Sequence, residues 1–135
     1  MEFSNEYLEQ LLYNLIDHFE NEVVEFKEAR SNFSFEDIGK YFSAISNEAN
    51  IKQKQFGWLI FGVSNNKEIT STEYRKSERS LDSLKLEIAD RVSERLTFIE
   101  IYELYLVMNG VNKRVIMFQI PAAIPSIPTS WKGHY

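Results

Sequence analysis

The sequence predicts an α+β fold, in which a mixed or antiparallel sheet of five or six strands carries about three helices. Residues 56–63 contain no charged or polar side chain, which is typical of a strand covered on both faces. Other segments have apolar residues at helical spacing, and Asn109 with Gly110 separates two β-prone segments as in a hairpin. We therefore expect residues 56–63 near the centre of the sheet.

The N-terminal segment predicts a helix followed by a strand. Apolar residues recur at steps of three or four from about Asn5, and Ser4 is the expected helix cap. This apolar set is Leu8, Leu11, Leu12, Leu15, Ile16 and Phe19. Residues 22–27 then change to β-formers that alternate between two faces. Val24 and Phe26 belong to one face, and Val23, Glu25 and Lys27 belong to the other.

A second helix is predicted to begin at Phe35. Ser34 and Asp37 have the spacing of a capping box, and Phe33 with Ile38 has the spacing of a hydrophobic staple. The expected buried stripe consists of Ile38, Tyr41, Phe42, Ile45 and Ala49. Residues 51–55 then lead into the central strand.

The second half of the chain alternates between β-prone and helical patterns. After a turn at residues 65–66, residues 68–72 suit the return strand of a hairpin. A third helix is expected over residues 81–92, capped by Ser77 or Ser80. Two long strands should then flank the turn at 109–110. Their expected ranges are 96–108 and 114–120, and the prolines at 121, 125 and 128 predict an extended segment after them.

Composition narrows the classes of protein that the chain can represent. Its 135 residues suit one domain spanning residues 1–135, and the absence of cysteine excludes disulfides and thiolate metal sites. Two histidines and no glycine-rich phosphate loop give no sign of a zinc site or of a P-loop, so we expect no metal site and no cofactor. Without a signal peptide or a long apolar run, the protein is expected to be cytoplasmic and not bound to a membrane.

Charge is distributed unevenly along the chain. The net charge is −5, but residues 1–26 contain seven acids and no Lys or Arg. Residues 27–135 therefore hold 15 bases and 13 acids. Because electrostatic fields act through local patches, one face of this remainder can still bind a polyanion. An ordinary solvated surface explains the same charges equally well.

Short motifs in a fixed order resemble the Schlafen-type Alba-like domain family, whose bacterial members were earlier labelled divergent ATPases. The motifs extend from residue 20 to residue 135. They are Glu20 with Glu25, Phe26 and Lys27, then Ala49-Asn50, residues 57–63, Thr72-Glu73-Tyr74-Arg75, residues 115–123, Ile127-Pro128 and residues 131–135.

The resemblance implies an α+β domain that binds DNA or RNA and belongs to a bacterial transcriptional regulator. It also leaves a homodimer open. In that family the domain usually precedes a further C-terminal region, and the aromatic ending at Tyr135 agrees with a fragment of a longer protein.

The resemblance also raises an enzymatic alternative. In some Schlafen members, residues matching Glu20, Glu25 and Lys27, with an Asp after a Gly-Val pair, form a metal-dependent ribonuclease site. Here Ser64 and Asn65 follow Val63, and neither supplies the negative charge that a divalent ion requires. We therefore favour a domain without catalysis of its own. The alternatives are a ribonuclease that uses these two glutamates and a nucleotide-binding (ATP) or oligomerisation domain.

The expected contacts with nucleic acid involve one lysine of the first predicted strand and basic side chains on either side of the third helix's start. The candidates for phosphate contacts are Lys27, Arg75, Lys76, Arg79, Lys85 and Arg91, and Tyr74 is the candidate for base stacking. Each neutralised phosphate should contribute a slope of about 0.9 to the dependence of affinity on salt in a log–log plot. A solvated basic segment before a helix is the competing interpretation.

Overall fold

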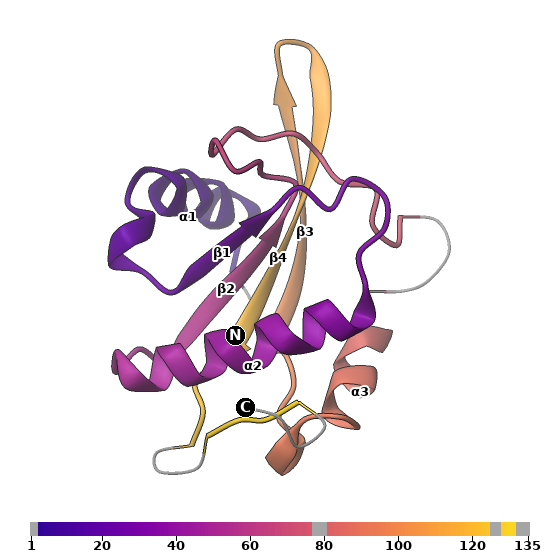
Figure 1. Cartoon of the computed structure of the whole chain (residues 1–135). Helices are drawn as coiled ribbons and strands as arrows, with labels where there is room; N and C mark the ends of the chain where they lie inside the picture. Colours follow the sequence, from indigo (N-terminus) through magenta and orange to yellow (C-terminus); the bar gives the residue numbers. More distant parts are fainter. Residues whose placement is uncertain (1–2, 77–80, 125–127, 132–135) are drawn as a thin grey trace.

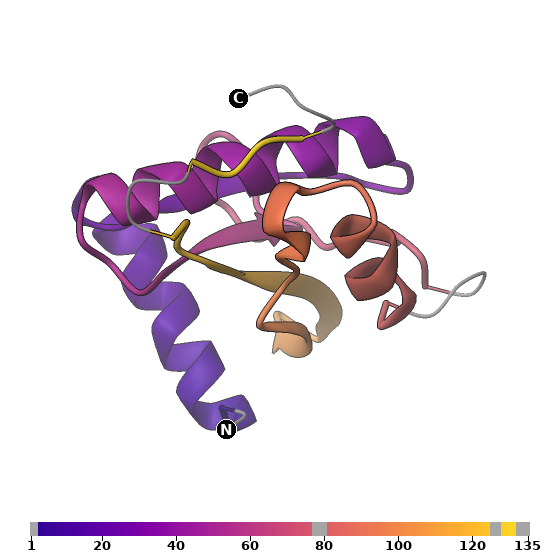
Figure 2. The same cartoon turned by 90° about the horizontal axis from the view of Figure 1, so that it is seen from below.

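The computed structural model describes residues 3–76, 81–124 and 128–131, and these residues form three layers (Figures 1 and 2). Helix α1 covers one face of a central sheet, and α2 and α3 cover the other. The α-helices are α1 (Asn5–Asp17), α2 (Phe35–Ile51) and α3 (Ser83–Ala89), and the strands are β1 (Val24–Lys27), β2 (Phe56–Phe61), β3 (Glu100–Met108) and β4 (Val111–Pro121). Within the described ranges, no helix is long and apolar enough to span a bilayer.

The sheet is mixed, and its strand order is β1-β2-β4-β3. Strands β1 and β2 are parallel and are joined through α2, whereas β4 is antiparallel to both of its neighbours. The α+β class is thus confirmed. The expected number of strands was too high, because the described residues form a sheet of four strands.

Two segments that were expected to be strands are largely irregular. Residues 68–72 make one isolated bridge, between Ile69 and Val63, and Ser71 has a positive φ of 80° that ends any extended run. Strand β3 begins at Glu100 and not at residue 96, because residues 96–98 follow the short 3-10 turn η2 (Ser93–Arg95) without regular structure and the backbone bends at Ile99. Both predicted strands were therefore too long or absent where the backbone turns.

Strand β2 lies in the interior of the sheet, as the apolar run predicts. Leu59 and Phe61 face α2, and Trp58 and Ile60 face α1, and all four are buried. Gly57 allows α2 to approach closely, because a Cβ built there would lie 2.6 Å from Cγ2 of Ile45. The continuous apolar run therefore corresponds to two packed faces, which confirms the prediction.

The first two helices begin where the caps predict. The Ser4 hydroxyl accepts a hydrogen bond from the Tyr7 amide at 3.2 Å, and the Ser34 hydroxyl accepts one from the Asp37 amide at 3.4 Å. The third helix is shorter than expected, and Asp82 precedes it without a side-chain cap. Both of its expected caps, Ser77 and Ser80, lie outside the described residues.

Strands β3 and β4 form a long hairpin whose tip projects beyond the other layers (Figure 1). Asn109 and Gly110 have φ values of 52° and 77°, which match a type I′ turn. The predicted hairpin turn is thus confirmed, but Met108 and Val111 are paired directly across it, so β4 begins at Val111 and not at the expected Arg114.

Residues after β4 return along α2. Asn47 donates to the Thr129 carbonyl at 2.9 Å and accepts from its amide at 2.6 Å, as a neighbouring strand would. The Trp131 indole donates to Glu36 at 2.9 Å and lies against Gly39, where a Cβ would come within 2.3 Å of the ring. This segment, residues 129–131, is therefore held by the second helix.

Candidate nucleic-acid interface

The loops that follow the two parallel strands meet at one end of the sheet. Residues 28–33 follow β1 and residues 62–76 follow β2; together we call them the loop cluster. The Gly62 amide donates to the Lys27 carbonyl at 2.8 Å, and the Glu73 amide donates to the Arg30 carbonyl at 2.7 Å. Ligands of sheets with parallel strands commonly bind beyond the carboxyl ends of those strands. This end of the sheet is therefore the natural position for a site.

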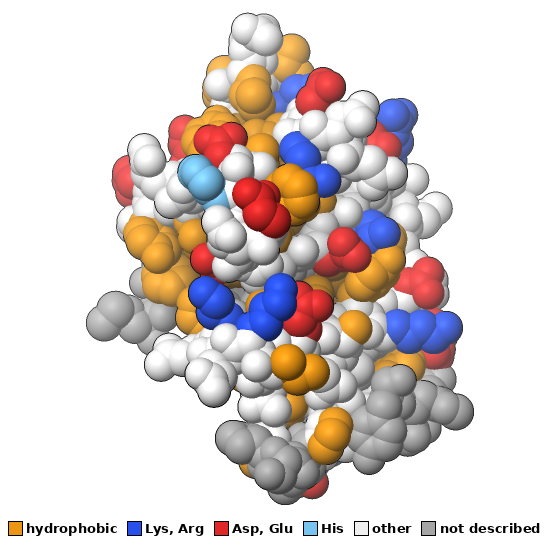
Figure 3. Space-filling model, turned by 60° about the vertical axis from the view of Figure 1, so that its left-hand side comes forward, with side chains coloured by type: hydrophobic (Ala, Val, Ile, Leu, Met, Phe, Trp, Pro, Cys, Tyr) orange, Lys and Arg blue, Asp and Glu red, His pale blue; other side chains and the backbone are white. Residues whose placement is uncertain are grey.

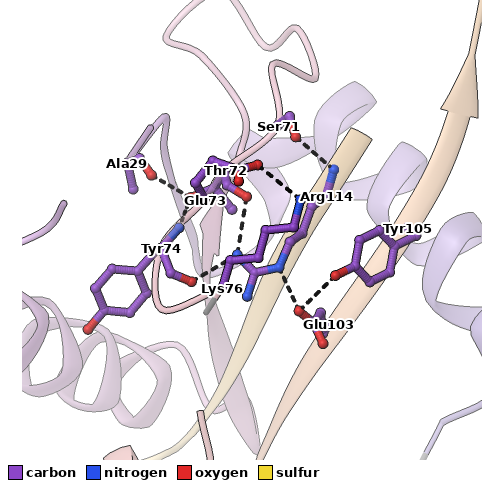
Figure 4. A network of polar contacts seen from close by, with 9 residues as sticks. All are labelled: Ala29, Ser71, Thr72, Glu73, Tyr74, Lys76, Glu103, Tyr105 and Arg114. Atoms are coloured by element: carbon purple, nitrogen blue, oxygen red, sulfur yellow. Dashed lines mark hydrogen bonds and ion pairs between the residues drawn. The ribbon is translucent and has the colours of Figure 1, made fainter. Parts of the chain in front are cut away.

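Arg114 of β4 holds the loop cluster against the sheet (Figure 4). Its side chain is only 2% exposed. Nη1 donates to the carbonyls of Tyr74 at 2.8 Å and Thr72 at 3.1 Å, and Nε donates to Oε2 of Glu103 at 2.6 Å. The Arg114 backbone amide also donates to the Ser71 hydroxyl at 2.9 Å. One buried cation thus fixes the path of residues 71–74.

The backbone of the loop cluster is strained. Lys67, Ser71 and Arg75 have positive φ values of 66°, 80° and 49°. Residues other than glycine rarely adopt this left-handed region, because their Cβ atom collides with the backbone. Each such residue costs on the order of 1 kcal/mol or more, and it persists only where surrounding contacts fix it. Arg114 supplies such contacts at Ser71, Thr72 and Tyr74.

Two of the residues predicted to bind phosphate form ion pairs with carboxylates of the same chain. Arg75 forms a two-pronged ion pair with Glu87 of α3, with distances of 3.1 and 3.2 Å. Burial opposes the charge of Arg75, but its contacts with Glu87 and Tyr74 outweigh that effect and raise the pKa of Arg75 above its ordinary value. Lys85 lies 2.6 Å from Glu100. Both cations hold α3 to its surroundings, which gives them a structural role.

The candidate stacking residue is buried. The ring of Tyr74 packs edge-on against Phe61, with ring centroids 5.3 Å apart. A base therefore has no access to its face in this conformation.

The other predicted cations are spread over different parts of the surface. Lys76 is exposed beside Glu73 at 3.4 Å, whereas the Arg91 guanidinium lies 5.6 Å from the ring centroid of Phe35, beside α2. Arg79 lies outside the described residues. On the face shown in Figure 3, basic and acidic side chains intermingle without a large area of one sign. The predicted residues that the structure describes are thus not gathered into one patch.

Glu25 and Lys27 lie on the same face of β1, opposite Leu59 and Phe61 of β2 in the sheet register. The Lys27 ammonium lies 4.8 Å from the ring centroid of Tyr41, and this contact raises the pKa of Lys27 although partial burial opposes it. Glu20 is exposed in the short 3-10 turn η1 (Phe19–Asn21). Among the described residues, no group of three or more His, Asp or Glu side chains is arranged to hold a metal ion.

The position that carries an acid in the ribonuclease pattern has another role here. The Ser64 hydroxyl accepts from the Glu68 amide at 3.2 Å, and the Ser64 amide donates to the Glu68 carbonyl at 2.8 Å. Asn65 is exposed, and its carbonyl accepts from the Lys67 ammonium at 3.1 Å. Both residues therefore form a tight surface loop.

Two of the hollows beside the loop cluster are lined mainly by polar and charged residues. One, of about 410 Å³, is lined by Arg30, Thr70, Ser71, Glu73 and Lys113, and the other, of about 340 Å³, includes Lys76, Glu103 and Arg114. Arg30 and Lys113 were not among the predicted contact residues, because no motif marks them. Arg30 is exposed and has only a 3.4 Å contact with Glu28, and Lys113 forms no ion pair within the described part of the chain. Because Arg30 and Lys113 are only weakly neutralised by neighbouring acids, they can bind an external anion.

Comparison with known proteins agrees with the resemblance drawn from the motifs. A family model described as Schlafen, AlbA_2 matches residues 20–135, which is most of the chain. No curated protein matches the sequence.

Proposed function

The chain belongs to the Schlafen, AlbA_2 family, and from this membership we propose that it is a nucleic-acid-binding domain without catalysis, part of a transcriptional regulator. The proposed contact surface is the hollow beside the loop cluster. The observation that carries this choice is the pair Arg30 and Lys113, which line one hollow and lack strong internal partners. This pair replaces Arg75 and Lys85 as the main candidates for phosphate contacts.

The chemistry of the hollow suits a phosphate of a nucleic-acid backbone. Arginine and lysine donate charge-assisted hydrogen bonds to phosphate oxygens. The Ser71 hydroxyl accepts from the Arg114 amide, so its own hydrogen remains free to donate outward. None of these groups reads a base edge, so we expect binding that depends on salt more than on sequence.

Reversing the two exposed charges should weaken binding. We expect Arg30→Glu combined with Lys113→Glu to lower affinity for short oligonucleotides at low salt by at least about tenfold, and to reduce the salt slope by roughly 2, because two phosphate contacts are lost. Fluorescence anisotropy with single- and double-stranded DNA and RNA of one sequence measures both quantities and also identifies the preferred nucleic acid.

A matched control changes the charge equally at another place. Lys52 and Lys54 are exposed beyond the end of α2, far from the loop cluster in the fold, and they contact Glu48 and Glu22. The double variant Lys52→Glu and Lys54→Glu should keep most of the wild-type affinity for oligonucleotides. Equal losses in both double variants would show that only net charge matters, and would contradict the proposed surface.

We expect no metal-dependent cleavage of RNA by this domain. Glu20 and Glu25 offer two carboxylates, and Ser64 and Asn65 add no third, whereas divalent ions at phosphates are held by several hard oxygen ligands. Incubation of single-stranded and structured RNA with Mg²⁺ or Mn²⁺ checks this. Cleavage that disappears in both Glu20→Gln and Glu25→Gln would establish the ribonuclease and refute the non-catalytic assignment. Asn65→Asp is the converse test, since it restores an acid in that loop.

A further inference from the structure

Strand β3 is the outermost strand of the sheet on one side, and its outer edge pairs with no other described strand. The turn at Asn109 and Gly110 fixes which peptide groups face outward. Residues flanking a two-residue turn share a pair of hydrogen bonds, so Met108 directs its peptide groups to β4. By alternation, the peptide groups of Val107, Tyr105 and Glu103 point away from the sheet. They form a ready template for another strand.

The strand lacks most of the usual protection of an exposed edge, although the Ile101 amide donates to the Glu100 carboxylate at 3.1 Å. Its nine residues include no Lys, Arg or Pro, and its pairing with β4 continues without a bulge from Glu100 to Met108. Its two acids are already neutralised, since Glu100 lies 2.6 Å from Lys85 and Glu103 lies 2.6 Å from Arg114. Charge therefore does little to keep a second strand away.

Apolar side chains are exposed along the same edge. Tyr105 and Val107 are 47% and 76% exposed, and they lie within a few residues of the turn at Asn109 and Gly110. Both are on the face of the sheet that α2 covers farther down, where Ile101 is buried. The unpaired edge and the uncovered apolar side chains thus coincide on β3.

We propose that a second copy of this chain pairs antiparallel with β3 about a two-fold axis at Leu104. In this register Ile101 faces the partner's Val107, and Glu103 faces the partner's Tyr105. Within one chain the Tyr105 hydroxyl already donates to Glu103 at 3.1 Å, so the same two groups suit each other across the interface. A two-fold axis at Glu103 would instead place two acids directly opposite, which destabilises a strand pair.

The self-complementary pattern is what favours a second copy over a foreign strand. Backbone hydrogen bonds fit any extended peptide, but the matched pairs on each side of Leu104, Ile101 with Val107 and Tyr102 with Leu106, follow from this sequence itself. The result is one continuous sheet across two copies.

Sedimentation velocity over about a hundredfold range of protein concentration tests the proposal, because association follows mass action. We expect the wild-type chain to shift from monomer to dimer. Val107→Glu places a new charge on the edge and should leave a monomer at every concentration. Val111→Glu is the matched control, because Val111 is also exposed, at 53%, but belongs to β4. It should dimerise as the wild type does.

A cross-link tests the register. The chain has no cysteine, so Leu104→Cys introduces a single thiol that would face its own copy. Under mild oxidation we expect a disulfide-linked dimer from Leu104→Cys and none from Val111→Cys. If Leu104→Cys fails to fold, the sedimentation of Val107→Glu still tests whether the chain dimerises through β3. A wild-type monomer at all concentrations, or a dimer that Val107→Glu does not weaken, would overturn the proposal.

Discussion

Ile60→Asp should leave almost no folded protein. Ile60 is 0% exposed in β2, between Phe26 of β1 and Met117 of β4 in the register, and it faces the layer formed by α1. A carboxylate there would be buried without a partner, at a cost of several kcal/mol, roughly the whole stability of a small domain. Soluble yield and a circular dichroism melt measure the effect.

The same substitution at a second isoleucine is the control. Ile51 ends α2 and is 78% exposed, so Ile51→Asp should change the free energy of unfolding by only a few tenths of a kcal/mol. If Ile60→Asp melted like the wild type, β2 could not be the covered central strand.

Arg114→Met should release the loop cluster while the sheet remains. The variant loses charge-assisted hydrogen bonds to the Thr72 and Tyr74 carbonyls, and it leaves Glu103 without its cation. Because Glu103 is partly exposed and water screens its charge, most of the loss comes from the two carbonyls. We expect a cost of about 3 kcal/mol in denaturant unfolding, with faster amide exchange over residues 71–76.

Lys113, the neighbour of Arg114 in β4, provides the control substitution. Lys113→Met removes an equal charge from a partly exposed side chain and should alter stability by less than about 0.5 kcal/mol. Equal losses in the two variants would mean that Arg114 contributes through charge alone and does not hold the loop cluster in place.

Local signals explain which elements the sequence predicted well. The caps at Ser4 and Ser34, the apolar run of β2 and the turn at Asn109 each act within a few residues, and each has the predicted structure. The segment around Ser71 has a pattern typical of a strand. Its backbone is instead set by Arg114, which lies far away in the sequence, so no local pattern could predict it.

The candidate site was harder to predict for a related reason. Tyr74 and Arg75 look like a basic and aromatic pair suited to nucleic acid, but Phe61 and Glu87 engage them inside the fold. Arg30 and Lys113 come to one hollow only because the loop after β1 and the start of β4 meet there. A list of charges along a chain does not distinguish a cation that is paired internally from one that is free to bind a ligand.

The strand order also determines when this protein can fold during its synthesis. Strand β4 fills the position between β2 and β3, although both of those strands leave the ribosome before it. Until residues 111–121 emerge, the most apolar strand has one open side, and β3 has no partner at all. A nascent chain that stops before β4 should therefore expose its core strand to chaperones or to other chains, and this sheet should be completed only after residues 111–121 have left the ribosome.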